Sequence, residues 1–441
     1  MTPEEERYRT LTPTSGLMFA EAASHLPGGD SRSPLFHPPY PVVWKAGAGC
    51  RLEDVDGNQL LDFTGNHTSL VLGYGHPAVD EAIRSQLGRG PVFPGTSEPQ
   101  LCLARTLCER VPSFERVRFT NSGTEAVMLG VRAARAFTGR TTVAKVEGGY
   151  NGSVDAVMVS TAPTLAEAGP QARPRAVPGS AGLPPGTCES TVVLPFNDAD
   201  AATSLVEEHA GDLAAVVVEP VLGSAGMIPA DPEYLQALRE AATAAGALLV
   251  FDEVVSFRVD YGGAQELYGV TPDVTCLGKL VGGGLPLGVV GGRADVMAVF
   301  DPTRALPPVP HPGSYNANPL SLAAAQATLD VLDRSAVQRL NARGEEVRSR
   351  IAGALSAAGL LAFVTGLGSL FAVHFTAGPV RTYRDAARGD SGLRRRLFLG
   401  LFVEGVLIDP RGVGCLSLPV GDPEVERLIA ATEVVAARLA E

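Results

Sequence analysis

The chain has 441 residues, 45% hydrophobic and 19% charged, a composition typical of soluble globular proteins; its length predicts two domains, or one large domain with a smaller one. Its 36 Lys plus Arg against 48 Asp plus Glu give a net charge of −12, so we expect no surface for nucleic acid or an anionic membrane. No stretch approaches the roughly 18 consecutive apolar residues of a membrane span.

The cysteines, the histidines and the N-terminal residues exclude several further classes of protein. The six cysteines include no C-x-x-C pair and the seven histidines no H-x-x-x-H pair, which argues against a disulfide framework and a zinc site. No G-x-S-x-G motif of a serine hydrolase occurs either. The first residues, MTPEEERYRTL, are acidic and lack the apolar segment of a signal peptide. We therefore expect a cytoplasmic protein with reduced thiols and no metal site.

The predicted elements begin with paired strands and continue as alternating helices and strands. Residues 41–63 should form short strands that turn on Asp56-Gly57, a dipeptide typical of hairpins. We expect helices at 79–87, 98–111, 124–138, 200–209 and 232–245. We expect strands at 117–120, 142–147, 214–220, 247–253, 273–278 and 288–293. Continuous apolar strands separated by helices predict an α/β fold with a parallel sheet covered on both faces.

The C-terminal part has a different pattern. A long helical stretch at 319–357 precedes two strand-like runs, LLAFVT and SLFAVHFT, and a final helix is expected at 423–440. This pattern predicts a smaller α+β domain that includes the N-terminal segment. We therefore expect an N-terminal segment at 1–65, a large domain at 66–318 and a C-terminal small domain at 319–441. Residues 162–187 contain six prolines and should form an active-site flap or a partly mobile loop.

The first candidate site is the stretch FTNSGTEA, where a predicted strand leads into a helix. The small residues Ser122, Gly123 and Thr124 would leave helix N–H groups free to bind an anion such as a phosphate. The alternative is structural, because Ser122-x-x-Glu125 is also a capping box. It is not a Walker motif, since no G-x-x-x-x-G-K-[ST] occurs in the chain.

The second candidate is Tyr150 in EGGYNGSVD. The flanking glycines would let its ring project from a strand end into a cleft, although an ordinary glycine-rich turn explains the same residues.

Two predicted strands end in acids, Glu219 in VVVEP and Asp252 in LLVFDEV. Ligands of open α/β sheets bind beyond the carboxyl ends of the strands. A half-buried carboxylate there needs a positive or donor partner, and a protonated pyridine nitrogen would be one. The alternatives for Asp252 are that it caps the next helix or pairs with Arg258.

Lysine is rare in this chain: only Lys45, Lys145 and Lys279 occur, and arginine supplies the other cations. Lys279 follows Asp252 by 27 residues and ends the next predicted strand, so both side chains should reach one edge of the sheet. An amine among apolar residues has a lowered pKa and can act as nucleophile and base, which arginine cannot. Lys45 lies on an early hairpin, and Lys145 should face a covering helix or pair with Glu147.

Together these motifs resemble the class III aminotransferases of PLP fold type I over residues 20–440. The resemblance rests on NSGTEA, GGYNG, VVEP, FDEV, CLGKLVGGGLP and HPGSYNANPL. It is strongest to the branch of glutamate-1-semialdehyde aminomutases and β-phenylalanine-type aminotransferases. It implies a large domain with a mostly parallel sheet between helices and a smaller α+β domain from the N- and C-terminal segments. It also implies pyridoxal 5′-phosphate (PLP) as cofactor.

The resemblance also implies roles for single residues. Lys279 would form the Schiff base, Asp252 would hold the pyridine nitrogen, Tyr150 would stack on the ring and Val254 would pack on its other face. Gly123 and Thr124, beside Ser122, would bind the phosphate. Ser314 would reach the phosphate of a partner subunit, so a homodimer is expected. Glu219 should lie near cofactor or substrate. Asn151 stands where the family commonly has His, which leaves any contact of that His open.

Two arginines bear on the substrate. Arg32 in PGGDSRSPLF and Arg411 in DPRGVGCLSLP lie in stretches that resemble those holding substrate carboxylates in the β-amino-acid aminotransferases. The resemblance therefore favours amino transfer between a β- or aryl amino acid and a 2-oxo acid. The alternatives are an intramolecular 2,1-aminomutase that uses the same residues, and an inert PLP-binding protein. The intact pair Lys279 and Asp252 speaks against the last.

Overall fold

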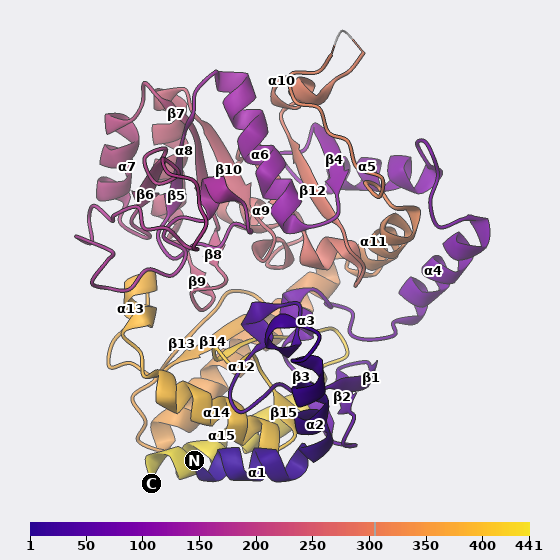
Figure 1. Cartoon of the computed structure of the whole chain (residues 1–441), viewed down its shortest axis with the longest axis vertical. Helices are drawn as coiled ribbons and strands as arrows, with labels where there is room; N and C mark the ends of the chain where they lie inside the picture. Colours follow the sequence, from indigo (N-terminus) through magenta and orange to yellow (C-terminus); the bar gives the residue numbers. More distant parts are fainter. Residues whose placement is uncertain (304–305) are drawn as a thin grey trace.

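The computed structural model describes residues 1–303 and 306–441. Figure 1 shows a helix-covered sheet in the upper part and a smaller group of helices and strands below, where both termini lie close together. The sheet contains seven strands in the order β4-β12-β11-β10-β7-β5-β6. Their bounds are β4 (Arg116–Thr120), β12 (Gly288–Gly292), β11 (Val274–Leu277), β10 (Leu248–Asp252), β7 (Leu213–Val218), β5 (Thr142–Val146) and β6 (Thr191–Leu194).

The sheet is mostly parallel, but β12 runs antiparallel to both β11 and β4. This agrees with the expected mostly parallel sheet, although the antiparallel direction of β12 was not foreseen. A parallel connection needs a crossover of a dozen or more residues, and the link 278–287 between β11 and β12 is too short for one. This link carries Lys279, so the reversal of the chain places that residue at the sheet edge.

Both faces of the sheet are covered by helices, as predicted. α6 (Gly123–Thr138) packs its apolar side on strands β5, β7, β10 and β11. α7 (Ala199–Glu208) and α8 (Pro232–Ala245) cover the opposite face. The strands buried between these layers are mostly apolar, and β7 (LAAVVV) is wholly so, because neither face contacts water.

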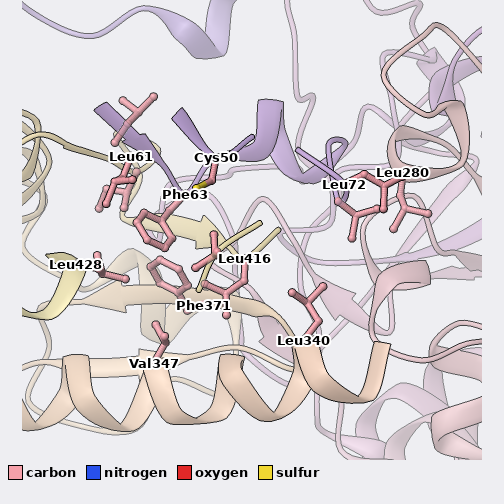
Figure 2. Close-up of a cluster of buried hydrophobic side chains, with 14 of the residues drawn as sticks. Cys50, Leu61, Phe63, Leu72, Leu280, Leu340, Val347, Phe371, Leu416 and Leu428 are labelled. Atoms are coloured by element: carbon pink, nitrogen blue, oxygen red, sulfur yellow. The ribbon is translucent and has the colours of Figure 1, made fainter. Parts of the chain in front are cut away.

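The lower part joins both ends of the chain. β1 (Trp44–Ala48), β2 (Arg51–Asp54) and β3 (Gln59–Asp62) form the predicted meander, and β15 (Val406–Leu407) adds to β3 in parallel. A second sheet contains β13 (Phe363–Thr365), β14 (Leu370–His374) and β16 (Val413–Cys415). The core between them unites N- and C-terminal side chains such as Phe63, Phe371 and Leu428, as Figure 2 shows.

The helical stretch predicted at 319–357 is two helices, α11 (Pro319–Val331) and α12 (Arg334–Ala357). The Asp333 side chain accepts a hydrogen bond from the Ala336 N–H and so begins the second helix. α11 packs against α4 (Pro77–Arg89) and α5 (Glu98–Arg110). The remaining elements are α1 (Pro3–Leu11), α2 (Pro13–Ala22), α3 (Gly65–Thr68), α9 (Ala264–Tyr268), α10 (Ala294–Met297), α13 (Tyr383–Ala387), α14 (Ser391–Val403), α15 (Asp422–Ala440), β8 (Val221–Leu222) and β9 (Ile228–Pro229).

Residues 162–187 form a loop without helix or strand in the described structure. Arg384 holds it: its guanidinium donates to the carbonyls of Ala168 at 3.0 Å and Gly169 at 2.7 Å while it pairs with buried Glu147 at 2.8 Å. The flap function remains a prediction.

We propose that the chain is divided into an N-terminal segment at 1–65, a large domain at 66–318 and a C-terminal small domain at 319–441. α11, in the third range, packs against helices α4 and α5 of the second. None of the helices in the two described ranges is long and apolar enough to cross a membrane.

Candidate active site

The candidate site lies at the carboxyl ends of β10 and β11. Asp252 is the last residue of β10 and is in register with Cys276 of the parallel β11, three residues before Lys279. Burial lowers the pKa of the Lys279 amine, while the negative charges of Asp252 and Glu219 oppose this effect. Part of Lys279 stays accessible to solvent. The structure therefore joins a nucleophilic amine and a buried acid at one sheet edge, as the sequence predicts.

Asp252 is 4% exposed and its carboxylate accepts two hydrogen bonds. Asn151 Nδ2 donates to Oδ2 at 2.9 Å and the Val254 N–H donates to Oδ1 at 3.1 Å. Burial raises the pKa of Asp252, and it outweighs the opposite effect of these two hydrogen bonds and of the positive charges of Lys279 and Lys145. The suggested pairing with Arg258 is wrong, because that guanidinium donates to the Thr68 carbonyl at 3.0 Å and Ser369 Oγ at 2.9 Å.

Tyr150 is held by its backbone rather than by its ring. Its N–H donates to Glu219 Oε1 at 2.7 Å, and Glu219 Oε2 accepts from the Gly223 N–H at 3.1 Å. The side chain is 40% exposed, and its hydroxyl lies 3.2 Å from Ser153 Oγ. Burial raises the pKa of Glu219 to about 8. Glu219 thus fixes the turn that presents the aromatic ring.

The loop Ser122–Thr124 begins α6 beside this turn. Ser122 Oγ accepts from the Glu125 N–H at 3.1 Å, but Glu125 turns its carboxylate to the Asn121 N–H at 2.8 Å, so the capping box is half formed. The first turn of a helix leaves N–H groups without intrahelical acceptors. A Cβ on Gly123 would lie 2.7 Å from Val254 Cγ2, so only glycine allows this close approach. The loop can accept an anion at the helix N-terminus.

Lys145 lies below the same turn and is fully buried. Its ammonium group donates to the carbonyls of Gly149 at 2.9 Å, Val159 at 2.7 Å and Val146 at 3.3 Å. The suggested pairing with Glu147 is wrong, because Glu147 is bound by Arg384. Burial lowers the pKa of Lys145 to about 8, against the negative charge of Glu219. Lys145 thus stabilises the backbone on both sides of Tyr150 through these carbonyls.

Replacing Lys145 by methionine should lower the free energy of unfolding by about 2–5 kcal/mol, because buried carbonyls lose their donor. Chemical denaturation of both proteins would measure this difference. Lys45→Met is the matched control: Lys45 forms an exposed pair with Glu53 at 2.5 Å, and its loss should change stability little. Equal effects of the two substitutions would contradict the role assigned to Lys145.

The two arginines predicted for the substrate lie in a neighbouring region. Arg411 binds Asp409 through two bonds, Nε to Oδ1 at 2.8 Å and Nη2 to Oδ2 at 2.9 Å. Its positive charge also contributes to lowering the pKa of Lys279, which places it within electrostatic range of the amine. Arg32 donates from Nη1 to Asn66 Oδ1 at 3.0 Å and lines a cavity of about 650 Å³. Apolar residues, among them Met18 and Leu35, share that cavity.

Ser314 is placed elsewhere. It lines a different cavity, of about 600 Å³, together with Phe93 and Arg118. Its segment touches the phosphate-loop region through Asn316, whose Oδ1 accepts from Asn121 Nδ2 at 3.0 Å. In the described chain Ser314 itself makes no hydrogen bond with residues 122–124. A role toward a partner subunit therefore stays a prediction.

The side chains and N–H groups at this site fit PLP. A buried carboxylate suits a pyridine nitrogen, a desolvated amine suits an aldehyde, and a helix N-terminus suits a phosphate. The chain matches the family model described as aminotransferase class-III over residues 35–420. The chain belongs to the class III aminotransferases. These enzymes depend on PLP, so the expected cofactor and α/β fold type are confirmed.

Individual class III aminotransferases resemble the chain along nearly its whole length. It is 39% identical to the β-phenylalanine transaminase of Variovorax paradoxus, over 96% of this chain and 93% of that one. It is also 39% identical to the glutamate-1-semialdehyde 2,1-aminomutase of Methanothermobacter thermautotrophicus, over 95% and 97%. An ω-transaminase structure from Sphaerobacter thermophilus superimposes with a TM-score of 0.93 at 43% identity, covering 97% of each chain. The expected branch of the class III aminotransferases is confirmed.

Sequence reasoning missed three polar residues at this class III aminotransferase site: Asn66, His67 and Asp409. Asp409 stands two residues before Arg411, a spacing that lets a carboxylate bind the nearby guanidinium, and this signal was readable. Lys145 was identified from the sequence, but its hydrogen bonds to the carbonyls around Tyr150 were not predicted. Asn66 and His67 belong to a short turn with no motif, so only the folded chain reveals them.

Proposed function

We propose that this enzyme moves an amino group between a β- or aryl amino acid and a 2-oxo acid. The observation that carries the proposal is the position of Arg411. It pairs with Asp409, which also contacts His67 of the segment Gly65–Thr68, and this segment packs against residues 279–282. Asp409 and His67 line the same largely apolar cavity as Arg32. A carboxylate held by Arg411 would bring the substrate amine toward Lys279, and the cavity would take an aryl group. The similarity to a β-phenylalanine transaminase supports the same substrate class.

Each residue of the site would have a distinct role in this reaction. Bound PLP supplies an aldehyde that accepts the amino group and a ring that withdraws electrons. Lys279 Nζ would hold the cofactor and, once the substrate amine has taken its place, would carry a proton to and from the substrate carbon. Asp252 would keep the ring nitrogen protonated. Tyr150, whose backbone is fixed by Glu219, and Val254 would hold the ring. Ser122, Gly123 and Thr124 would bind the phosphate.

A test of this function uses a β-aryl amino acid and 2-oxoglutarate, with glutamate as the measured product. Replacing Arg411 by alanine should raise KM for the carboxylate substrate by roughly 10–100-fold, because a charged hydrogen-bonding partner is lost. An amine without a carboxylate, such as 1-phenylethylamine, serves as the control substrate. An unchanged KM in Arg411→Ala would refute the carboxylate assignment, and absence of glutamate would refute the transaminase activity.

A 2,1-aminomutase is the second candidate, because the aminomutase relative is as similar as the transaminase relative. Isomerisation of the substrate without any 2-oxo acid would identify it. The Arg411-Gly412 pair favours the transaminase, since the stretch around it resembles that of the β-amino-acid aminotransferases.

We further propose a cytoplasmic homodimer in which Ser314 reaches the phosphate of the partner's cofactor. Exposed aromatic side chains support this proposal: Phe93, which lines the cavity of Ser314, is 42% exposed, and Tyr315, the residue after Ser314, is 65% exposed. A fully active monomer in sedimentation at assay concentration would contradict it.

A further inference from the structure

The turn at Gly65–Thr68 bends the chain into a rarely used backbone conformation. Asn66, His67 and Thr68 have φ values of 47°, 54° and 74°, all left-handed. Each such non-glycine residue costs roughly 1–2 kcal/mol, and asparagine is the one that adopts it most readily. Strain of this kind persists only where surrounding contacts enforce it, and it concentrates at functional sites.

Surrounding contacts do enforce it. The Asp62 carboxylate accepts from the Thr64 N–H at 2.7 Å and from Tyr74 OH at 2.8 Å, which fixes the entrance of the turn. The exit is fixed by Arg258, which donates to the Thr68 carbonyl at 3.0 Å. Asp62 and Arg258 are both buried, so the turn is held at both ends.

Two successive side chains of this turn are linked to the two arginines, Asn66 by direct contact with Arg32 and His67 through Asp409, the partner of Arg411. Asn66 Oδ1 accepts from Arg32 Nη1 at 3.0 Å. His67 Nδ1 lies 3.3 Å from Asp409 Oδ2, the carboxylate that binds Arg411 through two bonds. An extended backbone would place successive side chains on opposite sides, whereas the left-handed run brings both to the same region.

We infer that Asn66 and His67 are positioning residues for carboxylate recognition, Asn66 through Arg32 and His67 through Asp409 and Arg411. This inference rests on the proposed function, in which these arginines bind carboxylates. The physical reason is that a long arginine side chain loses rotamer freedom when it binds, and a partner that orients it beforehand reduces that loss. Asp409 uses two of the five N–H groups of Arg411, which leaves three for a substrate carboxylate.

The test compares His67→Gly and Asn66→Gly with Thr68→Gly, because glycine tolerates all three φ values and removes only the side chain. Thr68 contacts neither arginine through its side chain, so it is the matched control within the same turn. The ratio of kcat/KM for a β-aryl amino acid over 1-phenylethylamine should fall roughly 10-fold in the first two variants and stay constant in Thr68→Gly. The fall should come from KM.

Binding measurements and a conservative variant complete the test. Calorimetry with glutarate and the PLP-loaded enzyme should give about 10-fold weaker binding in His67→Gly. His67→Asn, which restores a donor near Nδ1 and suits a left-handed φ, should recover most of the affinity.

Three outcomes would overturn the inference: unchanged ratios in both variants while Arg411→Ala raises KM, an equal effect of Thr68→Gly, or no recovery in His67→Asn. If Arg411→Ala itself leaves KM unchanged, the proposed function fails instead.

Discussion

Replacing Lys279 by alanine is expected to lower kcat by about 10⁴-fold or more and to abolish the visible absorbance band of the bound cofactor. The substitution removes a nucleophile and a proton-transfer group together, and proton transfer alone contributes about 10²–10⁴-fold. Burial lowers the pKa of this amine, so it is available in its neutral, reactive form closer to neutral pH than a free lysine is. Steady-state kinetics and an absorbance spectrum of the purified variant would measure both effects.

Lys279→Arg separates charge from reactivity. Arginine keeps a cation at the sheet edge but cannot lose its proton in a protein, so this variant should be as inactive as Lys279→Ala. Substantial activity or a retained absorbance band in Lys279→Arg would show that another group binds the cofactor, and fully buried Lys145 would be the next residue to examine.

Replacing Asp252 by asparagine should have the second largest effect. It removes the negative charge that a protonated pyridine nitrogen needs in a buried site, and breaking such a pair costs about 3–5 kcal/mol. We therefore expect kcat to fall by roughly 10²–10³-fold, while the cofactor remains covalently bound through Lys279. Single-turnover kinetics with a β-aryl amino acid would isolate the affected step.

The neighbouring acid provides the control. Glu253 is fully buried and belongs to a separate network, with its carboxylate accepting from Gln265 Nε2 at 2.9 Å and from the Ala264 N–H at 2.5 Å. Glu253→Gln should lower the stability of the fold and leave the cofactor spectrum as it is. If Asp252→Asn proves harmless to turnover, or Glu253→Gln matches its kinetic effect, Asp252 is not the partner of the ring nitrogen.

Helices and strands that a local sequence pattern marks, such as an apolar run or a terminal glycine, could be predicted from the sequence. β7 and β10 are continuous apolar runs, and α6 and α8 end at glycines in the left-handed conformation, Gly139 and Gly246. The direction of β12 could not, because it depends on the length of a connection and not on the composition of the strand. α1 and α2 were missed because neither shows a clear apolar face. α1 is stabilised by distant partners, such as Arg396 on Glu4 at 3.0 Å.

In the candidate site, too, some residues could be predicted from the sequence and others only from the folded chain. Lys279, Asp252 and Tyr150 carry chemistry that their residue types and strand-end positions reveal. Asn151 was recognised only as a departure, since its bond to Asp252 joins residues 101 positions apart. The contact of His67 with Asp409 depends on the left-handed turn at residues 66–68, and no propensity predicts three such residues in succession.

The parallel pairing of β15 with β3 has a consequence for the order in which the protein is made. Residues 406–407 lie far along the chain from β3, so β3 can pair with this strand only after most of the chain has been synthesised. The seven-stranded sheet closes once residue 292 has emerged, and domains tend to fold as units during synthesis. The nascent chain can therefore assemble its cofactor edge well before Arg411 arrives to complete the substrate side.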